Sequence, residues 1–153
     1  MGIKSFQGSR KNVEQESDHI RVFSYMTRKL VTFSPEDSIE TVINSLIKNR
    51  ISGAPVVNEN NELIGMISEG DCIKQLSESR YFNMPMGDTR VKNHMVENVE
   101  TIDGHISIFD AANKFLESKR RRFPVLENGK LVGQISQMDV LKAAMKLKGQ
   151  KWK

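Results

Sequence analysis

Two stretches of the chain repeat their apolar residues with the spacing of an α-helix. Residues 39–47 follow an i, i+3, i+4, i+7, i+8 order, and residues 108–116 follow the same order. This spacing places five side chains on one helix face. The two stripes are Ile39, Val42, Ile43, Leu46 and Ile47, then Ile108, Ala111, Ala112, Phe115 and Leu116. Each stripe predicts an amphipathic helix whose apolar face lies in the core.

Short apolar runs surround both predicted helices in the same order. A brief strand is expected before each helix, and two strands joined by a polar turn are expected after it. The turns contain Asn and Gly, which tolerate the positive φ of tight turns. The expected strands are 30–33, 54–57 and 63–67, then 99–102, 123–126 and 131–135, with closing helices at 71–76 and 139–147. Each unit therefore has a predicted β-α-β-β-α order.

The two units are copies of one another. An offset of 69 aligns Met26 with Met95, and an offset of 68 after the turn aligns Asp71 with Asp139. A duplicated supersecondary unit defines the whole architecture. The predicted parts are an N-terminal extension (1–19), a first repeat (20–76), a linker (77–90) that reads as a connecting loop, a second repeat (91–147) and a basic tail (148–153).

One repeat alone is too small to bury a large core. A unit of about 60 residues leaves much of its apolar surface in water. We therefore expect the two repeats to pack sheet to sheet as a pseudo-twofold pair. The predicted fold class is α+β.

Composition narrows the class of protein. The 153 residues include one cysteine and three widely spaced histidines, so neither an intramolecular disulfide nor a zinc site is expected. The chain has no apolar run of membrane-spanning length, and no apolar segment follows the basic residues near its start. A cytoplasmic protein without a required cofactor or metal is expected. The single thiol, Cys72, is interpreted as a buried core residue.

The chain carries a formal net charge of +4, and much of the excess lies in two places. One is the run from Lys119 to Arg122, and the other is the set of lysines near the C-terminus. Nucleic acid binding through these residues is a third hypothesis. It is disfavoured because aromatic residues make up only 7% of the chain and offer no platform for stacked bases.

Candidate chemistry recurs where a strand meets the last helix of each repeat. The first copy reads Gly65-Met66-Ile67-Ser68-Glu69-Gly70-Asp71, and the second reads Gly133-Gln134-Ile135-Ser136-Gln137-Met138-Asp139. The N–H groups of a helix N-terminus suit a phosphate, and a carboxylate can accept bonds from two ribose hydroxyls. The same Ser-x-x-Asp spacing also describes a helix cap that needs no ligand. Both interpretations remain open at this point.

The duplicated pattern resembles the CBS domain family, named after cystathionine β-synthase. Each copy has a Pro-Val strand, a turn and then a G-h-x-[ST]-x-x-D motif; the h position is the apolar Met66 in the first copy and departs from the pattern as Gln134 in the second. The resemblance covers nearly all of residues 20–145. It implies a CBS pair, or Bateman module, with two clefts that in this family often hold AMP, ADP, ATP or a related adenosyl ligand.

The resemblance also implies roles for individual residues. Asp71 and Asp139 would hold ribose, with Ser68 and Ser136 beside phosphate. The strand before Pro-Val would line the adenine, and Thr32 and Thr101 could contact ligand. The remaining candidates are Ser52, Ala54, Pro55, Arg121, Arg122 and Pro124.

The two copies differ just before the Pro-Val strand. The resemblance places Arg121 and Arg122 near phosphate, where the first copy has Ser52 and Gly53. Guanidinium groups bind phosphate oxygens in pairs, so the second site is expected to favour the more anionic ligand. The alternative is a solvated charge run that only caps the preceding helix.

The leading hypothesis is a regulatory signalling module that binds an adenine nucleotide and passes the change to an unidentified protein partner. A homodimer is expected by resemblance. The alternative is a structural dimerisation module with empty clefts. No residues pair a nucleophile with a base and an orienting acid, so no catalytic residues are predicted and an enzyme is the least supported class.

Overall fold

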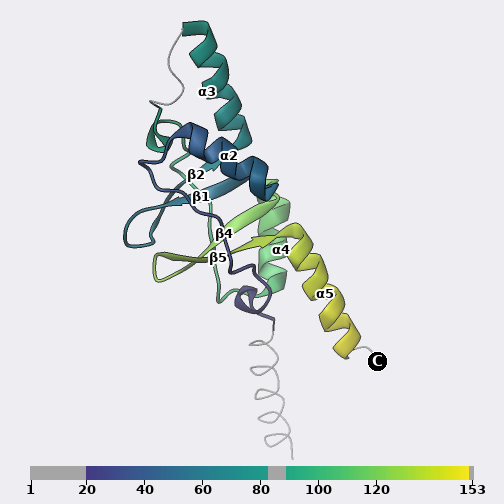
Figure 1. Cartoon of the computed structure of the whole chain (residues 1–153). Coiled ribbons are helices and arrows are strands. Elements are labelled where there is room, and N and C mark those ends of the chain that lie inside the picture. The colour runs from purple at the N-terminus through teal and green to yellow at the C-terminus, as the bar shows by residue number, and fades with distance from the viewer. Residues whose placement is uncertain (1–19, 83–88, 152–153) are drawn as a thin grey trace, which may run out of the picture. The chain divides into compact units, whose positions relative to one another are not determined.

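The computed structural model describes residues 20–82 and 89–151, which include both predicted repeats (Figure 1). The predicted N-terminal extension, residues 83–88 of the linker and residues 152–153 of the tail lie outside the described part. The helices are η1 (Val22–Ser24), α2 (Ile39–Asn49), α3 (Glu69–Phe82), η3 (Val91–Asn93), α4 (Ile108–Ser118) and α5 (Gln137–Lys151). The strands are β1 (Gly53–Val57), β2 (Leu63–Ser68), β3 (Ile102–Asp103), β4 (Arg122–Glu127) and β5 (Lys130–Ser136). The mixed α+β fold class and the tandem repeat are confirmed.

The described residues form two compact units that do not follow the order of the chain. The first-repeat unit contains residues 29–82, 89–100 and 128–131. The second-repeat unit contains residues 20–28, 101–127 and 132–151. The start of each predicted repeat, residues 20–28 and 91–100, therefore belongs to the unit built on the other repeat. The sequence pattern did not reveal this exchange.

The first-repeat unit is built on the β1–β2 hairpin, whose strands pair antiparallel with Gly53 opposite Ser68. Helix α2 begins at the Ser38 cap, whose hydroxyl accepts the Thr41 N–H at 3.1 Å. The helix ends at Arg50, which has a left-handed backbone (φ 52°). Its apolar face joins both strands in a core of Phe33, Ile39, Val42, Leu46, Ala54, Val56, Ile67, Cys72 and Val91.

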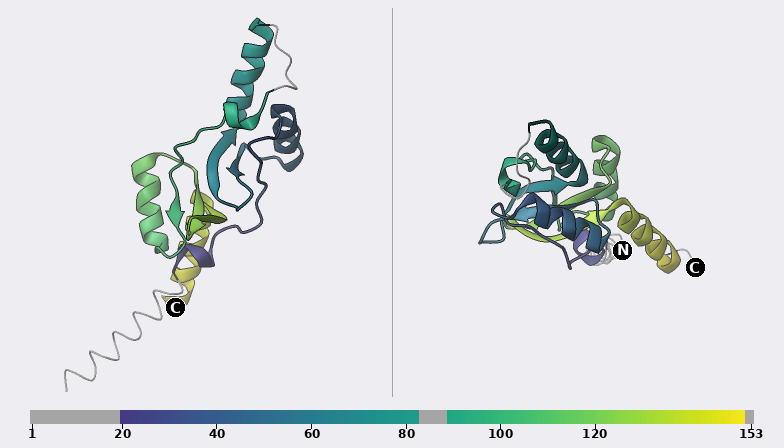
Figure 2. Two further views of the ribbon diagram at one scale, coloured as in Figure 1. Left: turned by 90° about the vertical axis from the view of Figure 1, so that its left-hand side faces the viewer. Right: turned by 45° about the horizontal axis from the view of Figure 1, so that its top comes forward.

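The second-repeat unit has the strand order β3-β4-β5, with β3 parallel to β4. Helix α4 repeats the design of α2, because Ser107 caps its start and Lys119 ends it with φ 57°. Its core contains Val22, Met26, Ile102, Ile108, Ala111, Phe115, Phe123, Val125, Ile135, Val140 and Ala143. Figure 2 shows the purple segment around η1 beside the elements of this unit.

Backbone hydrogen bonds fix the exchanged segments at the outer strands. Thr27 pairs with Gln134 of β5 through bonds of 2.8 and 2.9 Å. Val96 pairs with Met66 of β2 through two bonds of 2.9 Å. Each short sheet therefore gains an edge partner from the start of the other repeat.

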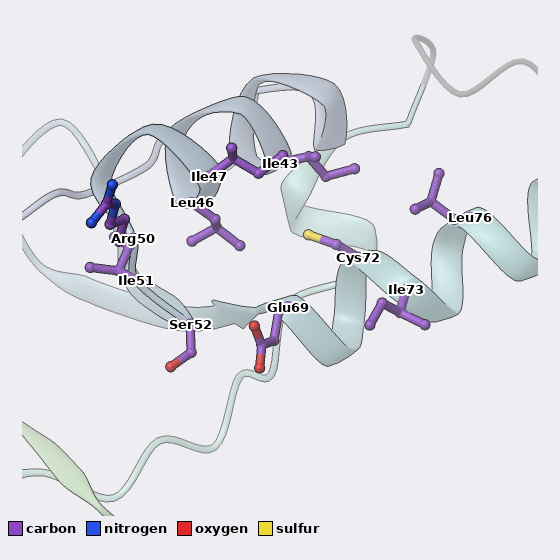
Figure 3. Close-up of a pocket in the computed structure, with 10 residues that line it drawn as sticks. All are labelled: Ile43, Leu46, Ile47, Arg50, Ile51, Ser52, Glu69, Cys72, Ile73 and Leu76. Atoms are coloured by element: carbon purple, nitrogen blue, oxygen red, sulfur yellow. The ribbon is translucent and has the colours of Figure 1, made fainter.

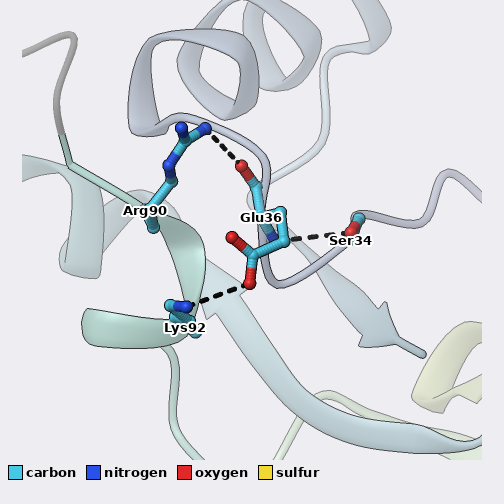
Figure 4. Close-up of polar contacts among 4 residues, drawn as sticks. All are labelled: Ser34, Glu36, Arg90 and Lys92. Carbon is cyan, nitrogen blue, oxygen red and sulfur yellow. Dashed lines mark hydrogen bonds and ion pairs between the residues drawn. The ribbon is translucent and has the colours of Figure 1, made fainter.

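Polar contacts also hold the segment that starts at residue 89 against the first-repeat unit (Figure 4). The Arg90 guanidinium donates to the Glu36 carbonyl at 2.7 Å, and the Lys92 ammonium pairs with the Glu36 carboxylate at 3.0 Å. The Glu36 N–H donates to the Ser34 hydroxyl at 3.3 Å. The ion pair is exposed and contributes little, so the backbone bonds carry most of this attachment.

Four predictions of secondary structure need correction. Residues 30–33 do not form a strand, because only Phe33 bridges β1, at Val56. Of the predicted strand 99–102, only Ile102 belongs to a strand, β3. The connecting-loop interpretation is wrong for residues 77–82, which continue α3. Helix α5 likewise continues past residue 147 to Lys151. Both closing helices extend because nothing in these stretches stops a helix, such as an internal proline.

The prediction that both helix stripes are wholly core is wrong at their last positions. Ile47 is 71% exposed and Leu116 is 80% exposed. Eight residues along an α-helix correspond to a rotation of about 80° from the first position, because each residue turns the chain by about 100°. The apolar stripe therefore curves out of the core and leaves an exposed apolar position at the end of each helix.

We expect Gly133→Ala to destabilise the protein because Gly133 lies against an exchanged segment. An added Cβ would lie 2.6 Å from the Met26 sulfur and 2.8 Å from the Thr27 carbonyl oxygen. That carbonyl is held by Gln134, so the free energy of unfolding should fall by about 1–3 kcal/mol. The matched control is Gly149→Ala in α5, where nothing lies within 4 Å of the added atom. Chemical denaturation that finds equal effects for both variants contradicts this packing.

Candidate functional site

The first candidate site is the junction of β2 and α3, where Ser68 and Asp71 bond each other. Asp71 Oδ2 accepts the Ser68 backbone N–H at 2.9 Å and the Ser68 hydroxyl at 2.9 Å. In return, the Asp71 N–H donates to the Ser68 hydroxyl oxygen at 3.3 Å. This reciprocal arrangement is a helix cap. Both side chains remain half-exposed, so the cap is open to solvent.

The second repeat has the same cap at the junction of β5 and α5. Asp139 Oδ2 accepts the Ser136 N–H at 2.9 Å, and the Asp139 N–H donates to the Ser136 hydroxyl at 3.1 Å. Within the described part of the chain, the Ser136 hydroxyl makes no bond to the carboxylate. Its proton can therefore be donated elsewhere, whereas the Ser68 proton is directed at Asp71.

The loop before each Pro-Val strand lies against its junction. The Glu69 N–H donates to the Ser52 carbonyl at 2.8 Å, and the equivalent Gln137 N–H donates to the Arg121 carbonyl at 3.0 Å. Gly53, whose counterpart is Arg122, lies opposite Ser68 in the hairpin register. The structure therefore places Ser52 next to the first cap and Arg121 next to the second.

The other predicted residues lie on the neighbouring strands. Ala54, Pro55 and Pro124 are buried within β1 and β4. Thr32 is exposed and precedes the Phe33 bridge to β1. Thr101 is half-exposed and precedes β3. Neither threonine side chain bonds a junction residue among the described contacts.

One difference between the junctions was missed by sequence reasoning. The residue directly after the motif serine is Glu69 in the first copy and Gln137 in the second. Both are exposed in the first turn of their helices. The signal was present in the aligned motifs, but only the backbone bonds to Ser52 and Arg121 show that this position adjoins the loop.

A pocket of about 440 Å³ adjoins the first junction (Figure 3). Most of its lining is apolar and comes from α2 and α3, with Cys72 on its wall. Ser52 and Glu69 lie at the edge opposite Ile43 and Ile47 (Figure 3). Ser68 and Asp71 do not line it, so the pocket is a neighbour of the predicted site and not the site itself.

Two classes of feature are missing from the part of the chain that the structure covers. Residues 20–82 and 89–151 contain no group of three or more His, Cys, Asp or Glu side chains placed to hold a metal ion. Within the same ranges no helix combines the length and apolar character needed to cross a bilayer.

Comparison with known proteins gives a family match for both repeats. The CBS domain model matches residues 22–78 and 91–146. The chloroplastic CBS domain-containing protein CBSX1 of Arabidopsis thaliana is 28% identical over 160 aligned residues, covering 83% of this chain and 65% of CBSX1. The protein MJ1225 of Methanocaldococcus jannaschii is also 28% identical, and the match covers 76% of this chain and 40% of MJ1225. The chain thus spans less than two thirds of the length of these relatives.

Solved structures show the same fold. The crystal structure of CBSX2 in complex with AMP matches with a TM-score of 0.72 and 27% identity, covering 84% of this chain and 98% of that one. The CBS pair of MJ0100, solved with 5′-methylthioadenosine and S-adenosyl-L-methionine, matches with a TM-score of 0.66, covering 86% of this chain and 98% of that one. Its identity is 23%, so it supports the fold alone.

We expect Cys72 to resist thiol reagents near neutral pH. The side chain is 3% exposed, and burial raises the pKa of its thiol, with a further increase from the neighbouring Asp71 carboxylate. Since only the thiolate reacts, alkylation of the native protein at pH 8 should be about tenfold or more slower than in denaturant. The alkylation rate of Cys72 should increase over a higher pH range in the native protein than in the unfolded chain. Equal native and denatured rates at pH 8 contradict this burial.

Proposed function

Because the chain belongs to the CBS domain family, with two repeats, we propose that it is a non-catalytic regulatory module that binds an adenosyl ligand at its strand–helix junctions. The observation that carries the proposal is the Ser-Asp cap, formed twice with the same backbone bonds. Support comes from the AMP complex of CBSX2, which shares 27% identity with this chain. Adenine nucleotides such as AMP, ADP and ATP are the proposed ligands.

The caps leave room for a ligand because each carboxylate uses one oxygen. Asp71 and Asp139 accept their serine N–H groups through Oδ2. Within the described residues, Oδ1 of each has no hydrogen-bond partner. A carboxylate oxygen has two lone pairs and can accept hydroxyl donors, so Oδ1 suits the vicinal hydroxyls of a ribose. The cap holds each carboxylate in place through Oδ2, and the ribose hydroxyls bond Oδ1.

Phosphate binding is proposed at the second junction in particular. The Ser136 hydroxyl has a proton to donate, and Arg121 adjoins the first turn of α5 through its carbonyl. Arg122 starts β4 at the position opposite the end of β5. Helix N-terminal N–H groups and guanidinium donors both favour anionic oxygens. We therefore propose that the second site holds the ligand with more phosphate charge.

Signalling to a partner protein requires that the ligand distinguish two states. A ligand shifts a conformational equilibrium only by its difference in affinity for the two arrangements. The ligand sites and the exposed helix faces are built on the same helices, α3 and α5, so ordering of a junction can affect what those faces bind. The regulated protein would read this change.

Isothermal titration tests the ligand proposal. We expect AMP, ADP or ATP to bind wild-type protein that has been shown free of carried-over ligand, with NAD and S-adenosylmethionine as comparison ligands. Asp71→Ala and Asp139→Ala should each remove one site because each deletes a ribose acceptor. If no adenosyl compound gives heat or a thermal shift, the proposal is wrong. The variants would then only lose a cap, which costs about 0.5–2 kcal/mol of stability.

A homodimer is part of the proposal. Ile47 of α2 and Leu116 of α4 occupy equivalent positions and are exposed, as are Ile73 of α3 and Leu141 of α5. Large exposed apolar faces mark interaction surfaces. Because the same face occurs twice in one chain, a second copy can present matching surfaces to both, as closed symmetric association requires.

Light scattering during size exclusion tests the homodimer. We expect a dimer mass for the wild type and a monomer mass for Leu116→Asp, because a buried unpaired charge opposes association. Val96→Asp is the control, since Val96 is an exposed apolar residue outside these helices. A monomeric wild type, or a dimer that persists in Leu116→Asp, would count against this interface.

A further inference from the structure

The two junctions share one backbone design but carry opposite local charge. Arg50 and Lys119 both end their helices in left-handed conformations, so each loop contains one cation at this position. The same N–H to carbonyl bond then closes each loop onto its helix. The difference lies in the residues that follow and in the first helical residue. These are Ile51, Ser52, Gly53 and Glu69 in the first copy, and Arg120, Arg121, Arg122 and Gln137 in the second.

Glu69 places a carboxylate at the first junction. Its backbone N–H is bonded to Ser52, and Figure 3 shows both side chains at one edge of the neighbouring pocket. Within the described residues, Glu69 forms no ion pair, and Arg50, which lines the same pocket, does not bond its carboxylate. A carboxylate in the first turn of a helix interacts favourably with the helix dipole. The Glu69 carboxylate therefore lies near the helix N-terminus, where the helix dipole would otherwise favour a phosphate.

Gln137 leaves the second junction without that negative charge. Its amide Nε2 donates to the Arg120 carbonyl at 3.0 Å, which holds the side chain against the arginine loop. A carboxylate at this position could not donate that bond. Asp71 and Asp139 are common to both sites, so they do not distinguish them. The residues at positions 69 and 137 therefore differ in charge, although their backbone N–H groups make the same bond to the loop.

We infer that Glu69 is a specificity residue that makes the first-repeat site select adenosyl ligands without a phosphate group. The inference rests on the proposed function, since it concerns the ligand of the same site. A phosphate next to Ser68 would lie near the Glu69 carboxylate, and like charges at such a site repel. A neutral nucleoside, a thioether or a cationic sulfonium derivative carries no such penalty. The chain would then bind two classes of adenosyl compound, one at each junction.

The experiment compares adenosine with AMP, which differ by the phosphate alone. In Asp139→Ala protein, which retains the first site, we expect adenosine to bind at least as tightly as AMP. Adding Glu69→Gln should raise AMP affinity by about 3- to 10-fold and leave adenosine affinity within about twofold, because the change removes one charge and keeps the shape. The gain should shrink at high salt, which screens exposed charges.

The reciprocal variant guards against a folding defect in the first pair. Asp71→Ala protein retains the second site. In this protein, Gln137→Glu should lower the affinity for AMP by a similar factor without lowering the affinity for adenosine. An unchanged ratio of AMP to adenosine affinity in both pairs overturns the inference and leaves the proposed function intact. If neither adenosine nor AMP binds the wild type or any variant, the inference is wrong, and if no other adenosyl compound binds either, the proposed function is wrong as well. A loss of stability without a change in this ratio identifies Glu69 as a helix-terminal charge only.

Discussion

The pairing of each short sheet with a segment from the start of the other repeat is the constraint on which the rest of the fold depends. Thr27 and Val96 bring backbone donors and acceptors to β5 and β2, which would otherwise be open edges. The approach requires glycine at positions 133 and 65, because an added Cβ would meet a carbonyl oxygen at 2.8 and 2.9 Å, respectively. Each unit therefore contains residues from the start of the other repeat, and its sheet edge depends on them.

Much of this architecture could be predicted because the repeat contains the information twice. The stripes of α2 and α4 predicted both helices, and Asn61, Asn128 and Gly129 take the positive φ values that the turn composition indicated. The exchange could not be predicted, since hydrophobic periodicity is a local signal and says nothing about which sheet a short segment joins. The aligned pair Met26 and Met95 was visible, but each could equally have packed on its own repeat. Residues 30–33 were wrongly assigned for a related reason: an apolar run becomes a strand only where a partner backbone is available.

The junction residues were identified from the sequence, but their use could not be decided there. Ser68 and Asp71 satisfy a helix cap and a ligand motif with the same atoms, so the pattern favours neither. The cap uses Oδ2 of Asp71, and Oδ1 has no hydrogen-bond partner among the described residues, so capping is compatible with the proposed ribose contact. A carboxylate fixed in this way loses less conformational freedom when a ribose binds. The cap is then a form of preorganisation rather than an alternative to binding.

Charge is the property that distinguishes two sites of nearly identical backbone. A module with two sites of the same selectivity would respond to one class of ligand, over one range of ligand concentration. Under the proposed function, Glu69 at one junction and Arg121 at the other would let the same fold respond to an adenosyl group with phosphate and to one without it. Since a ligand acts on an equilibrium only through its difference in affinity between states, two sites of different selectivity allow two ligands to shift it independently or against each other. Under this proposal, a difference at the residue after the motif serine is sufficient for this, because it changes the local charge and leaves the cap in place in both repeats.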